Sequence, residues 1–421
     1  MPLLAAALGL WPSTLPAQVS YVARFALDKS AYRVGEPIFC TFSIHNTGRR
    51  PFAFPYRNPT RIGNPELESE PRFLVVDAAG RRVHDPAPRR CGGVKGTALY
   101  GSVTLPPGQI HTERWLLNQW ARFSRPGRYR VRAERRLPLL GLDAAQGQFI
   151  GPPVAFALAL NDLTLDVSAS TEEQLRSIFE PFEKAVHEPE TREFPEAFQA
   201  VVTLPQPFLL DELVRLASAA TDEWRWDRQQ ALEALARIDT PAAWDAILRI
   251  AQGGDSPPRA ASPDSVEKVD SLRAHAILLL AEKGDRRFLP PILALLSQAP
   301  DSLRGAILRA LGLFRDARAN QALFERLHSA VSEERVNAIL GLRNLESRDA
   351  IPALIAMLND PEPPVRQVAH FALRNLTGER IQLSAAASAV ESARVAGQWR
   401  AWWRKQGPDY TPGRQPPCRD W

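Results

Sequence analysis

Apolar side chains in the second half of the chain recur with the spacing of an α-helix. Counted from each of five arginines, the third, fourth and seventh residues that follow are apolar, with His370 as the one exception. Residues with that spacing share one face of a helix, so each arginine begins an apolar stripe. The five arginines are Arg228, Arg273, Arg304, Arg335 and Arg366.

These stripes recur at a fixed interval. The last four arginines are 31 residues apart, and the first gap of 45 residues equals 31 plus an insertion of 14. A second apolar stripe precedes the arginine, as in Ile351, Leu354, Ile355 and Leu358. A period of this length indicates units that bury their apolar faces only against their neighbours. We therefore predict an all-α solenoid of five two-helix units over residues 205–378.

Short polar residues punctuate the repeats. Asp270, Asp301 and Ser332 stand three residues before their arginines, where a side-chain oxygen can accept from free N–H groups at a helix start. We expect them to be N-caps. The insertion, 253–268, is either a binding loop at one edge of the array or a flexible spacer.

The pattern changes to short alternating runs between residues 18 and 167. Runs at 20–27, 37–45, 72–77, 109–117, 127–133 and 153–167 are separated by turn-forming stretches such as Pro106-Pro107-Gly108. Many short strands at this spacing predict an all-β antiparallel sandwich.

One stretch of the helical region resembles a known family. Residues 360–373, from Asp360 through three prolines to Arg366 and Leu373, are similar to HEAT repeats of the short form called PBS-lyase HEAT-like repeats. The resemblance implies protein binding along a curved surface. It also implies that the five arginines form a structural polar ladder between adjacent units, which we favour over a ligand-binding role.

The strand-rich region carries a second resemblance. The segments 32–48, 105–108 and 123–131 resemble bacterial immunoglobulin-like domains. Proteinase-inhibitor-like and macroglobulin-like sandwich domains have similar sequences. The resemblance implies a fold class and no inhibitory activity, because no reactive loop can be named.

Both ends of the solenoid need a cover, since a terminal repeat exposes core. Residues 168–204 form a connector whose helix starts near 170–173 and is expected to cover the first repeat or bridge the modules. Near the other end, 387–406 is predicted to be a capping helix, favoured over a membrane-surface helix. Residues 407–421, rich in Pro and Gly, are expected to be disordered. The predicted stripe of the cap comprises Val390, Ala393, Ala396, Trp399, Trp402 and Trp403.

Charge is divided unevenly along the chain. Residues 18–167 hold 21 basic and 12 acidic residues, a net of +9, whereas residues 168–421 hold 31 and 35, a net of −4. Arginines clustered at 81–90 and 125–136 are interpreted as solvated residues on strands and loops rather than a binding site for anions. With an acidic solenoid, nucleic acid is not expected as a partner.

Residues 1–17 resemble a secretory signal. A short apolar core at 3–11 precedes Leu15-Pro16-Ala17, which is typical of a cleavage site, although no Lys or Arg precedes the core. We therefore expect a periplasmic or extracellular protein, and no later segment suits a membrane helix. In an exported protein Cys40 and Cys91 are the candidate disulfide, which leaves Cys418 free in the tail. The alternative is two buried thiols and one exposed thiol.

Residues that carry chemistry are scattered. The seven histidines show no metal-site spacing, His187-Glu188 is a lone pair, and no nucleophile or phosphate-loop motif occurs. We predict no catalytic, metal or cofactor-binding residue. The leading hypothesis is an exported, non-catalytic protein-interaction scaffold with protein partners and, as an open possibility, a peripheral envelope contact. Two competing hypotheses are an enzyme or enzyme subunit acting on a cell-envelope polymer, and a glycan-binding or protease-inhibitor-like sandwich.

Overall fold

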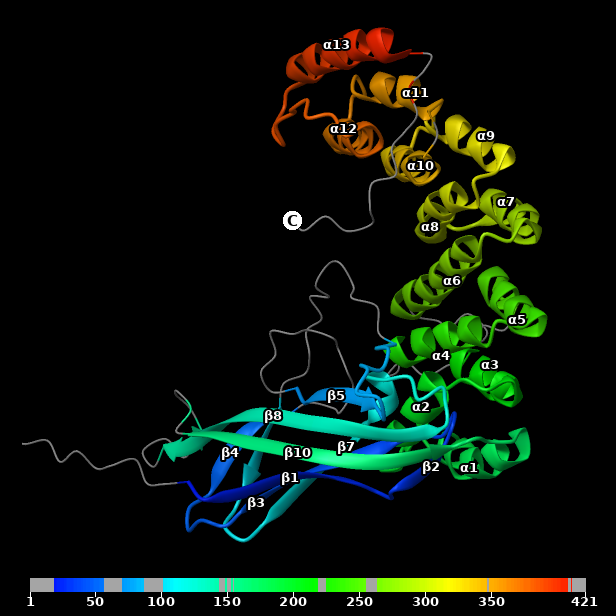
Figure 1. Cartoon of the computed structure of the whole chain (residues 1–421). Helices are drawn as coiled ribbons and strands as arrows, with labels where there is room; N and C mark the ends of the chain where they lie inside the picture. The colour runs from blue at the N-terminus through cyan, green and yellow to red at the C-terminus, as the bar shows by residue number, and fades with distance from the viewer. Residues whose placement is uncertain are drawn as a thin grey trace, which may run out of the picture. The chain divides into compact units, whose positions relative to one another are not determined.

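The chain forms two compact units in the computed structural model, Met1–Leu204 and Pro205–Trp421 (Figure 1). The structure describes residues 19–56, 70–86, 101–143, 148–149, 153, 155–218, 225–254, 263–346, 348–407 and 410. The predicted signal at 1–17 lies outside these residues.

The described part of the first unit contains two β-sheets, which precede the connector in the chain. One is antiparallel in the order β1 (Tyr21–Leu27), β3 (Phe39–Asn46), β7 (Ile110–Leu116). The other runs β2 (Ala31–Arg33), β10 (Ala155–Ser168), β8 (Gly127–Asp143), β4 (Phe52–Tyr56), β6 (Gly101–Leu105). Strands β5 (Arg72–Asp77) and β9 (Gln148–Phe149) also pair with β8, and the short helix η1 (Leu117–Gln119) follows β7.

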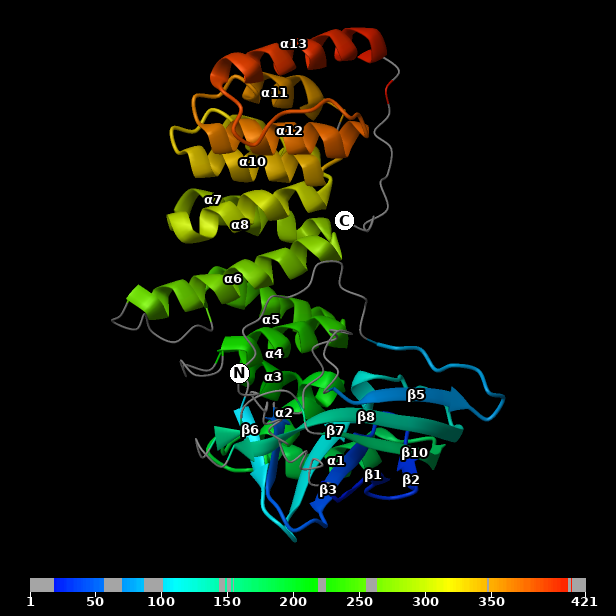
Figure 2. The same cartoon turned by 90° about the vertical axis from the view of Figure 1, so that its left-hand side faces the viewer.

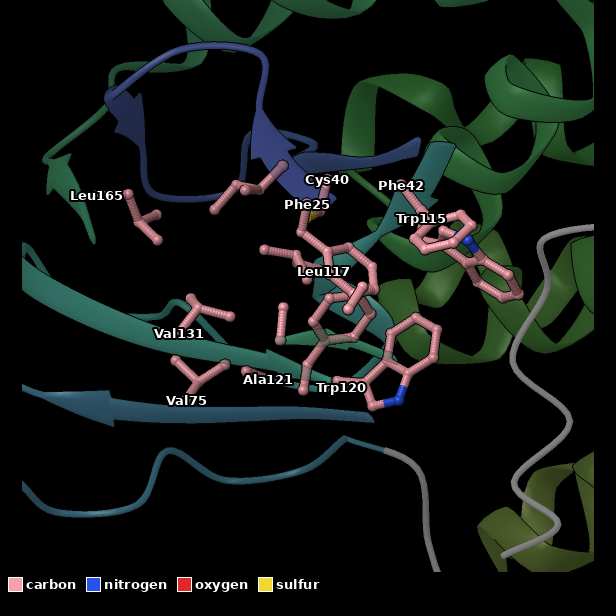
Figure 3. Packing of buried hydrophobic residues seen from close by; sticks show 14 of the residues in the cluster. Phe25, Cys40, Phe42, Val75, Trp115, Leu117, Trp120, Ala121, Val131 and Leu165 are labelled. Carbon is pink, nitrogen blue, oxygen red and sulfur yellow. The ribbon is translucent and has the colours of Figure 1, made fainter. Parts of the chain in front are cut away.

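The two sheets share one apolar core. Phe42 of β3 and Val131 of β8 belong to the same buried cluster as Trp115 and Leu165, because alternate residues of each strand point to one face (Figure 3). Removing these side chains from water is the main force that holds the sheets together. An N-terminal β-sheet region is therefore present, as the alternating pattern predicts.

Strand β8 extends ten residues past the predicted end at Ala133. Leu137 and Leu139 continue the buried alternation, but Arg135 occupies the buried position between Ala133 and Leu137. A charged residue at a core position interrupts the apolar pattern, so the sequence indicated too short a strand.

The predicted connector contains two helices. Helix α1 (Glu172–Ala185) begins with a reciprocal capping box between Thr171 and Gln174. Helix α2 (Phe194–Thr203) places Ala200 against Phe39 and Leu116 on the outer face of the three-stranded sheet. The connector is thus packed on the sheet, a contact that the sequence did not indicate, and its cover of the first repeat stays a prediction.

Paired helices build the second unit. The pairs are α3 (Leu210–Ser218) with α4 (Arg225–Ile238), α5 (Pro241–Gln252) with α6 (Pro263–Lys283), α7 (Leu289–Gln298) with α8 (Asp301–Leu311), α9 (Ala317–Arg326) with α10 (Ser332–Asn344), and α11 (Ala350–Met357) with α12 (Pro363–Thr377). Single turns precede α3 and α7, namely η2 (Pro207–Leu209) and η4 (Arg286–Phe288), and η5 (Gly312–Phe314) follows α8.

The second helix of each pair stacks closely on the second helix of the next. Contacts along α4, α6, α8, α10 and α12 are far more extensive than those along the first helices, so the second helices lie on the inner side of the stack. Figure 1 shows these two columns within the unit. Each pair buries its stripe only against its own helices and its neighbours.

Glycines allow the close approach of α8 and α10. A Cβ atom placed on Gly312 would lie 1.9 Å from the carbonyl oxygen of Gly341, and one on Gly341 would lie 2.4 Å from that of Leu308. Only a residue without a side chain fits where two backbones touch.

The predicted N-caps were wrong. Asp270 lies well inside α6, because the insertion continues as helix from Pro263 onward. Asp301 and Ser332 are already the first helical residues, after cap positions that make no side-chain hydrogen bond. Most of the remaining insertion, 255–262, lies outside the described residues.

Helix α13 (Ala389–Gln406) lies against α11 at the end of the stack (Figures 1 and 2). Trp399 is fully buried, but Val390 is 81% exposed and Ala393 is exposed too, so the predicted stripe was partly wrong. Three-residue steps drift around a helix, whereas the residues actually buried keep one face. They are Ser392, Val395, Ala396 and Trp399.

The predicted disordered tail lies mostly outside the described residues. Tyr410 is described, and its hydroxyl donates to the carbonyl of Leu376 at 2.8 Å. Its ring also packs 5.2 Å from that of Trp402, so this residue is held against the end of the array.

Candidate interaction surface

Each of the five arginines binds the first helix of its own repeat. The guanidinium donates to a main-chain carbonyl at or just after the C-terminal end of that helix, where the last carbonyls lack helical partners and carry partial negative charge. The bonds are Arg228 to Ala217 (3.1 Å), Arg273 to Ala251 (3.1 Å), Arg304 to Ala299 (2.9 Å), Arg335 to Ser329 (2.8 Å) and Arg366 to Asp360 (2.9 Å).

Two of these arginines also reach the following repeat. Arg304 donates to Glu334 at 2.6 Å, and Arg335 donates through two nitrogens to Asp360, both at 2.8 Å. The hydrogen bond to Asp360 raises the pKa of Arg335. Burial alone would raise the pKa of Glu334, but hydrogen bonds from Arg304 and Ser329 outweigh it and lower that pKa. These guanidinium groups are occupied within the array.

A different row of side chains faces away from the buried stripe. The fifth residue after each arginine lies on the opposite side of the second helix, since successive residues turn by about 100°. Each is partly or largely solvent-exposed, whereas the third, fourth and seventh are buried. This inner row comprises Glu233, Leu278, Arg309, Leu340 and Phe371.

The inner row changes character along the array. Glu233 lies 3.4 Å from His275, which is on α6, the second helix of the next repeat. Towards the other end, Arg309 donates to the side-chain oxygen of Asn337. Leu340 and Phe371 complete the row, and Phe371 is 44% exposed. Phe371 lies on α12, which packs on α10.

Arg343 lies beside this row. It donates to the side-chain oxygen of Asn344 at 2.8 Å, and its guanidinium carbon is 5.6 Å from the ring centre of Phe371. Burial lowers the pKa of Arg343. Within the described parts of the chain, neither Arg309 nor Arg343 pairs with a carboxylate, which separates them from Arg304 and Arg335.

A charged cluster lies inside the first unit. Glu113 accepts from Arg135 at 2.8 Å and lies 3.2 Å from Nε2 of His111. The guanidinium of Arg135 also stacks 4.4 Å from the ring of Phe42. Burial raises the pKa of Glu113, but the bond to His111 and the charge of Arg135 outweigh it and leave the pKa lowered. The interpretation of Arg135 as a solvated arginine was therefore wrong.

Of the two cysteines predicted to form a disulfide, the structure describes only Cys40. Cys40 is fully buried, and burial raises the pKa of its thiol to about 12. Cys91 lies outside the described residues, so the disulfide stays a prediction. Among the residues that the structure describes, no three His, Cys, Asp or Glu side chains converge as a metal site would. None of the described helices has the length and apolar character to cross a membrane.

Comparisons with known families agree with the helical repeats. A model described as HEAT repeats matches residues 268–336, and one described as PBS lyase HEAT-like repeat matches residues 334–360. A search of curated proteins gave no match. The C-terminal helical region therefore contains HEAT-like repeats, the class implied by the resemblance of residues 360–373. HEAT repeats generally mediate protein–protein interaction.

Proposed function

We propose that the protein is an exported, non-catalytic scaffold that binds partner proteins along the inner row of its HEAT-like array. The observation that carries the proposal is the contrast between two rows on the same helices. One row, the five arginines, binds the array to itself through main-chain carbonyls. The other row leaves Leu340 and Phe371 partly open to solvent on adjacent stacked helices.

We further propose that residues 18–167, within the first unit, form an immunoglobulin-like domain. Its two sheets share a core, and the hydroxyl of Tyr129 donates to the carbonyl of Arg125 at 2.6 Å, near the start of β8. A tyrosine that bonds back to the backbone a few residues upstream, at the entry to a strand, is a recurrent device of such sandwiches. This unit would provide a second contact with a partner or with the cell envelope.

The proposal that the protein is exported rests on the signal-like residues 1–17. Purifying the protein from the native cell and sequencing its amino terminus tests it directly. Cleavage after Ala17 would leave Gln18 as the first residue of material released from the envelope. Intact protein that stays with the cytoplasmic fraction would contradict export without touching the binding proposal.

Partner binding is tested by affinity purification from native envelope extracts. We expect one or a few proteins to be recovered with the wild-type chain and lost with the double variant Leu340→Glu, Phe371→Glu, which places two charges on the inner row. The variant Val390→Glu, at an 81% exposed position of α13, is the control. Equal recovery by all three chains would contradict a role for the inner row.

A further inference from the structure

We infer that the inner row, with Arg343 beside it, binds an acidic segment of the partner protein that also carries apolar side chains. The carboxylates would bind Arg309 and Arg343, and an apolar side chain would cover Leu340 and Phe371. This inference rests on the proposed function and adds the chemistry of the partner.

Arg309 and Arg343 carry positive charges that no carboxylate of the described chain neutralises. Arg304 and Arg335 donate to the carboxylates of Glu334 and Asp360. Arg309 and Arg343 instead donate to the amide oxygens of neighbouring asparagines. An amide oxygen accepts a hydrogen bond but does not neutralise a guanidinium. A partner's carboxylate would do both, through shorter and stronger charge-assisted bonds.

The surroundings of Arg343 strengthen its attraction for a carboxylate. It is half-buried between α10 and α12, and the loss of water around it lowers its pKa. The ring of Phe371, 5.6 Å away, forms part of that surrounding surface. Electrostatic attraction is stronger where water is excluded, so a carboxylate here gains more than on an open surface. An apolar side chain on Phe371 would exclude water further.

The spacing of these residues along the array matches the rise of an extended peptide. Arg309 lies on α8, Leu340 and Arg343 on α10, and Phe371 on α12, three successive second helices. Packed helices have axes roughly 8–10 Å apart. An extended peptide advances about 3.3 Å per residue, so about three residues of peptide match one step of the array. The partner segment would carry a glutamate or aspartate and an apolar residue about three positions apart.

A protein segment fits this surface better than nucleic acid does. Binding of single-stranded nucleic acid requires a groove with several cations along the backbone and stacking aromatics. The inner row has one aromatic side chain, and residues 168–421 carry 31 basic and 35 acidic residues, a net of −4. That net charge disfavours a long polyanion, whereas a short acidic segment needs only local complementarity.

The test measures binding of three fluorescein-labelled peptides of about ten residues to the full-length protein by fluorescence anisotropy. One alternates glutamate and leucine or phenylalanine at three-residue spacing, the second replaces each glutamate by glutamine, and the third by lysine. A thymidine oligonucleotide of similar length is the fourth probe. We expect the glutamate peptide to bind about tenfold more tightly than the glutamine peptide, as about 1.4 kcal/mol corresponds to one factor of ten.

Variants locate the binding. Arg309→Gln and Arg343→Gln are each expected to weaken glutamate-peptide binding about fivefold or more, on the order of one charge-assisted hydrogen bond. Phe371→Ser should weaken the glutamate and glutamine peptides alike. Arg400→Gln removes the same charge from an exposed position of α13 and should change nothing. Circular dichroism of each variant verifies that the helices are intact.

Three results would overturn the inference. The first is equal affinity for the glutamate and glutamine peptides, including no binding of either. The second is that Arg400→Gln weakens glutamate-peptide binding as much as Arg309→Gln and Arg343→Gln do. The third is that the oligonucleotide binds more tightly than the glutamate peptide and that Arg309→Gln and Arg343→Gln abolish this binding. If the peptides show no preference while affinity purification still recovers partners through Leu340 and Phe371, the acidic chemistry fails and the proposed function stands.

Discussion

The guanidinium of Arg335 lies across a repeat boundary and donates two parallel hydrogen bonds, each 2.8 Å long, to the carboxylate of Asp360. The same guanidinium donates to the carbonyl of Ser329 in its own repeat. One side chain therefore connects the end of one first helix to the end of the next. Both side chains are nearly buried, so each compensates the charge of the other.

Removing one partner of this pair should destabilise the array. In Asp360→Ala the arginine keeps its charge in a nearly water-free site, and loss of one partner of a buried pair costs about 3 kcal/mol. We expect that loss in the free energy of unfolding, followed by the helical circular dichroism signal. Asp162→Ala is the control, because its pair with Arg132 is exposed on both sides and its removal should have little effect. Equal stability of Asp360→Ala and wild type would contradict the structural role.

Replacing Gly341 by alanine should be more damaging than most surface changes. The new Cβ would lie 2.4 Å from the carbonyl oxygen of Leu308, so α8 and α10 would have to move apart. Overpacking of this kind typically costs about 1–3 kcal/mol. Gly397→Ala, in α13, is a matched control, because a Cβ there meets nothing within 4 Å. That substitution should be neutral or raise the melting temperature, since alanine favours helix.

Hydrogen–deuterium exchange gives a second reading of the glycine contact. Amides of α8 and α10 should exchange faster in Gly341→Ala than in wild type, whereas amides of α3 and α4 should not. Unchanged protection in α8 and α10 would show that the two helices are not in backbone contact.

The cluster around Glu113 predicts a pH dependence of stability in the first unit. The pKa of this carboxyl is lowered from its ordinary value of 4.5 in the folded chain. A folded pKa below the unfolded one means that the stabilisation is present above about pH 4.5 and is lost as the pH falls through the folded value. The variant Glu113→Gln should have a lower free energy of unfolding than wild type at neutral pH. On acidification its free energy of unfolding should fall less than that of wild type. Parallel pH curves for the two proteins would contradict this role of Glu113.

The thiol of Cys40 should be unreactive in the folded protein. Burial raises its pKa to about 12, so almost no thiolate is present near neutral pH, and the side chain is fully buried. In the variant Cys91→Ser, Cys418→Ser, alkylation of Cys40 should require unfolding by denaturant. Rapid alkylation under native conditions would show that β3 is exposed or opens readily. Mass spectrometry of the unreduced wild-type protein tests the predicted Cys40–Cys91 bond separately.

Much of the helical region could be predicted because its apolar stripes recur at a regular interval. The 31-residue interval and the apolar stripes indicated the helices from α4 to α12, and the family models match residues 268–360. Helix starts were harder to predict. Asp270 has the spacing of an N-cap, but the insertion continues as helix before it.

The candidate site was less predictable for a physical reason. Arg304 and Arg335 meet carboxylates of the following repeat, Arg309 meets an amide of the following repeat, and Arg343 meets the amide of Asn344 on its own helix. For Arg304, Arg309 and Arg335 the acceptor depends on packing between residues 25 to 30 positions apart. Arg135 shows the same limit, because its burial depends on Glu113 of another strand. The spacing of Leu278, Leu340 and Phe371 from their arginines was the signal that could have revealed the inner row.

We propose that a partner protein binds on the inner row of the HEAT-like array. Photo-crosslinking in the native cell can show this contact, with a photoreactive amino acid in place of Leu340 and, as the control, in place of the exposed Val390 of α13. We expect discrete crosslinked protein adducts from position 340 and none of the same mass from position 390. Adducts of the same mass from position 390 alone, or from neither position, would contradict it.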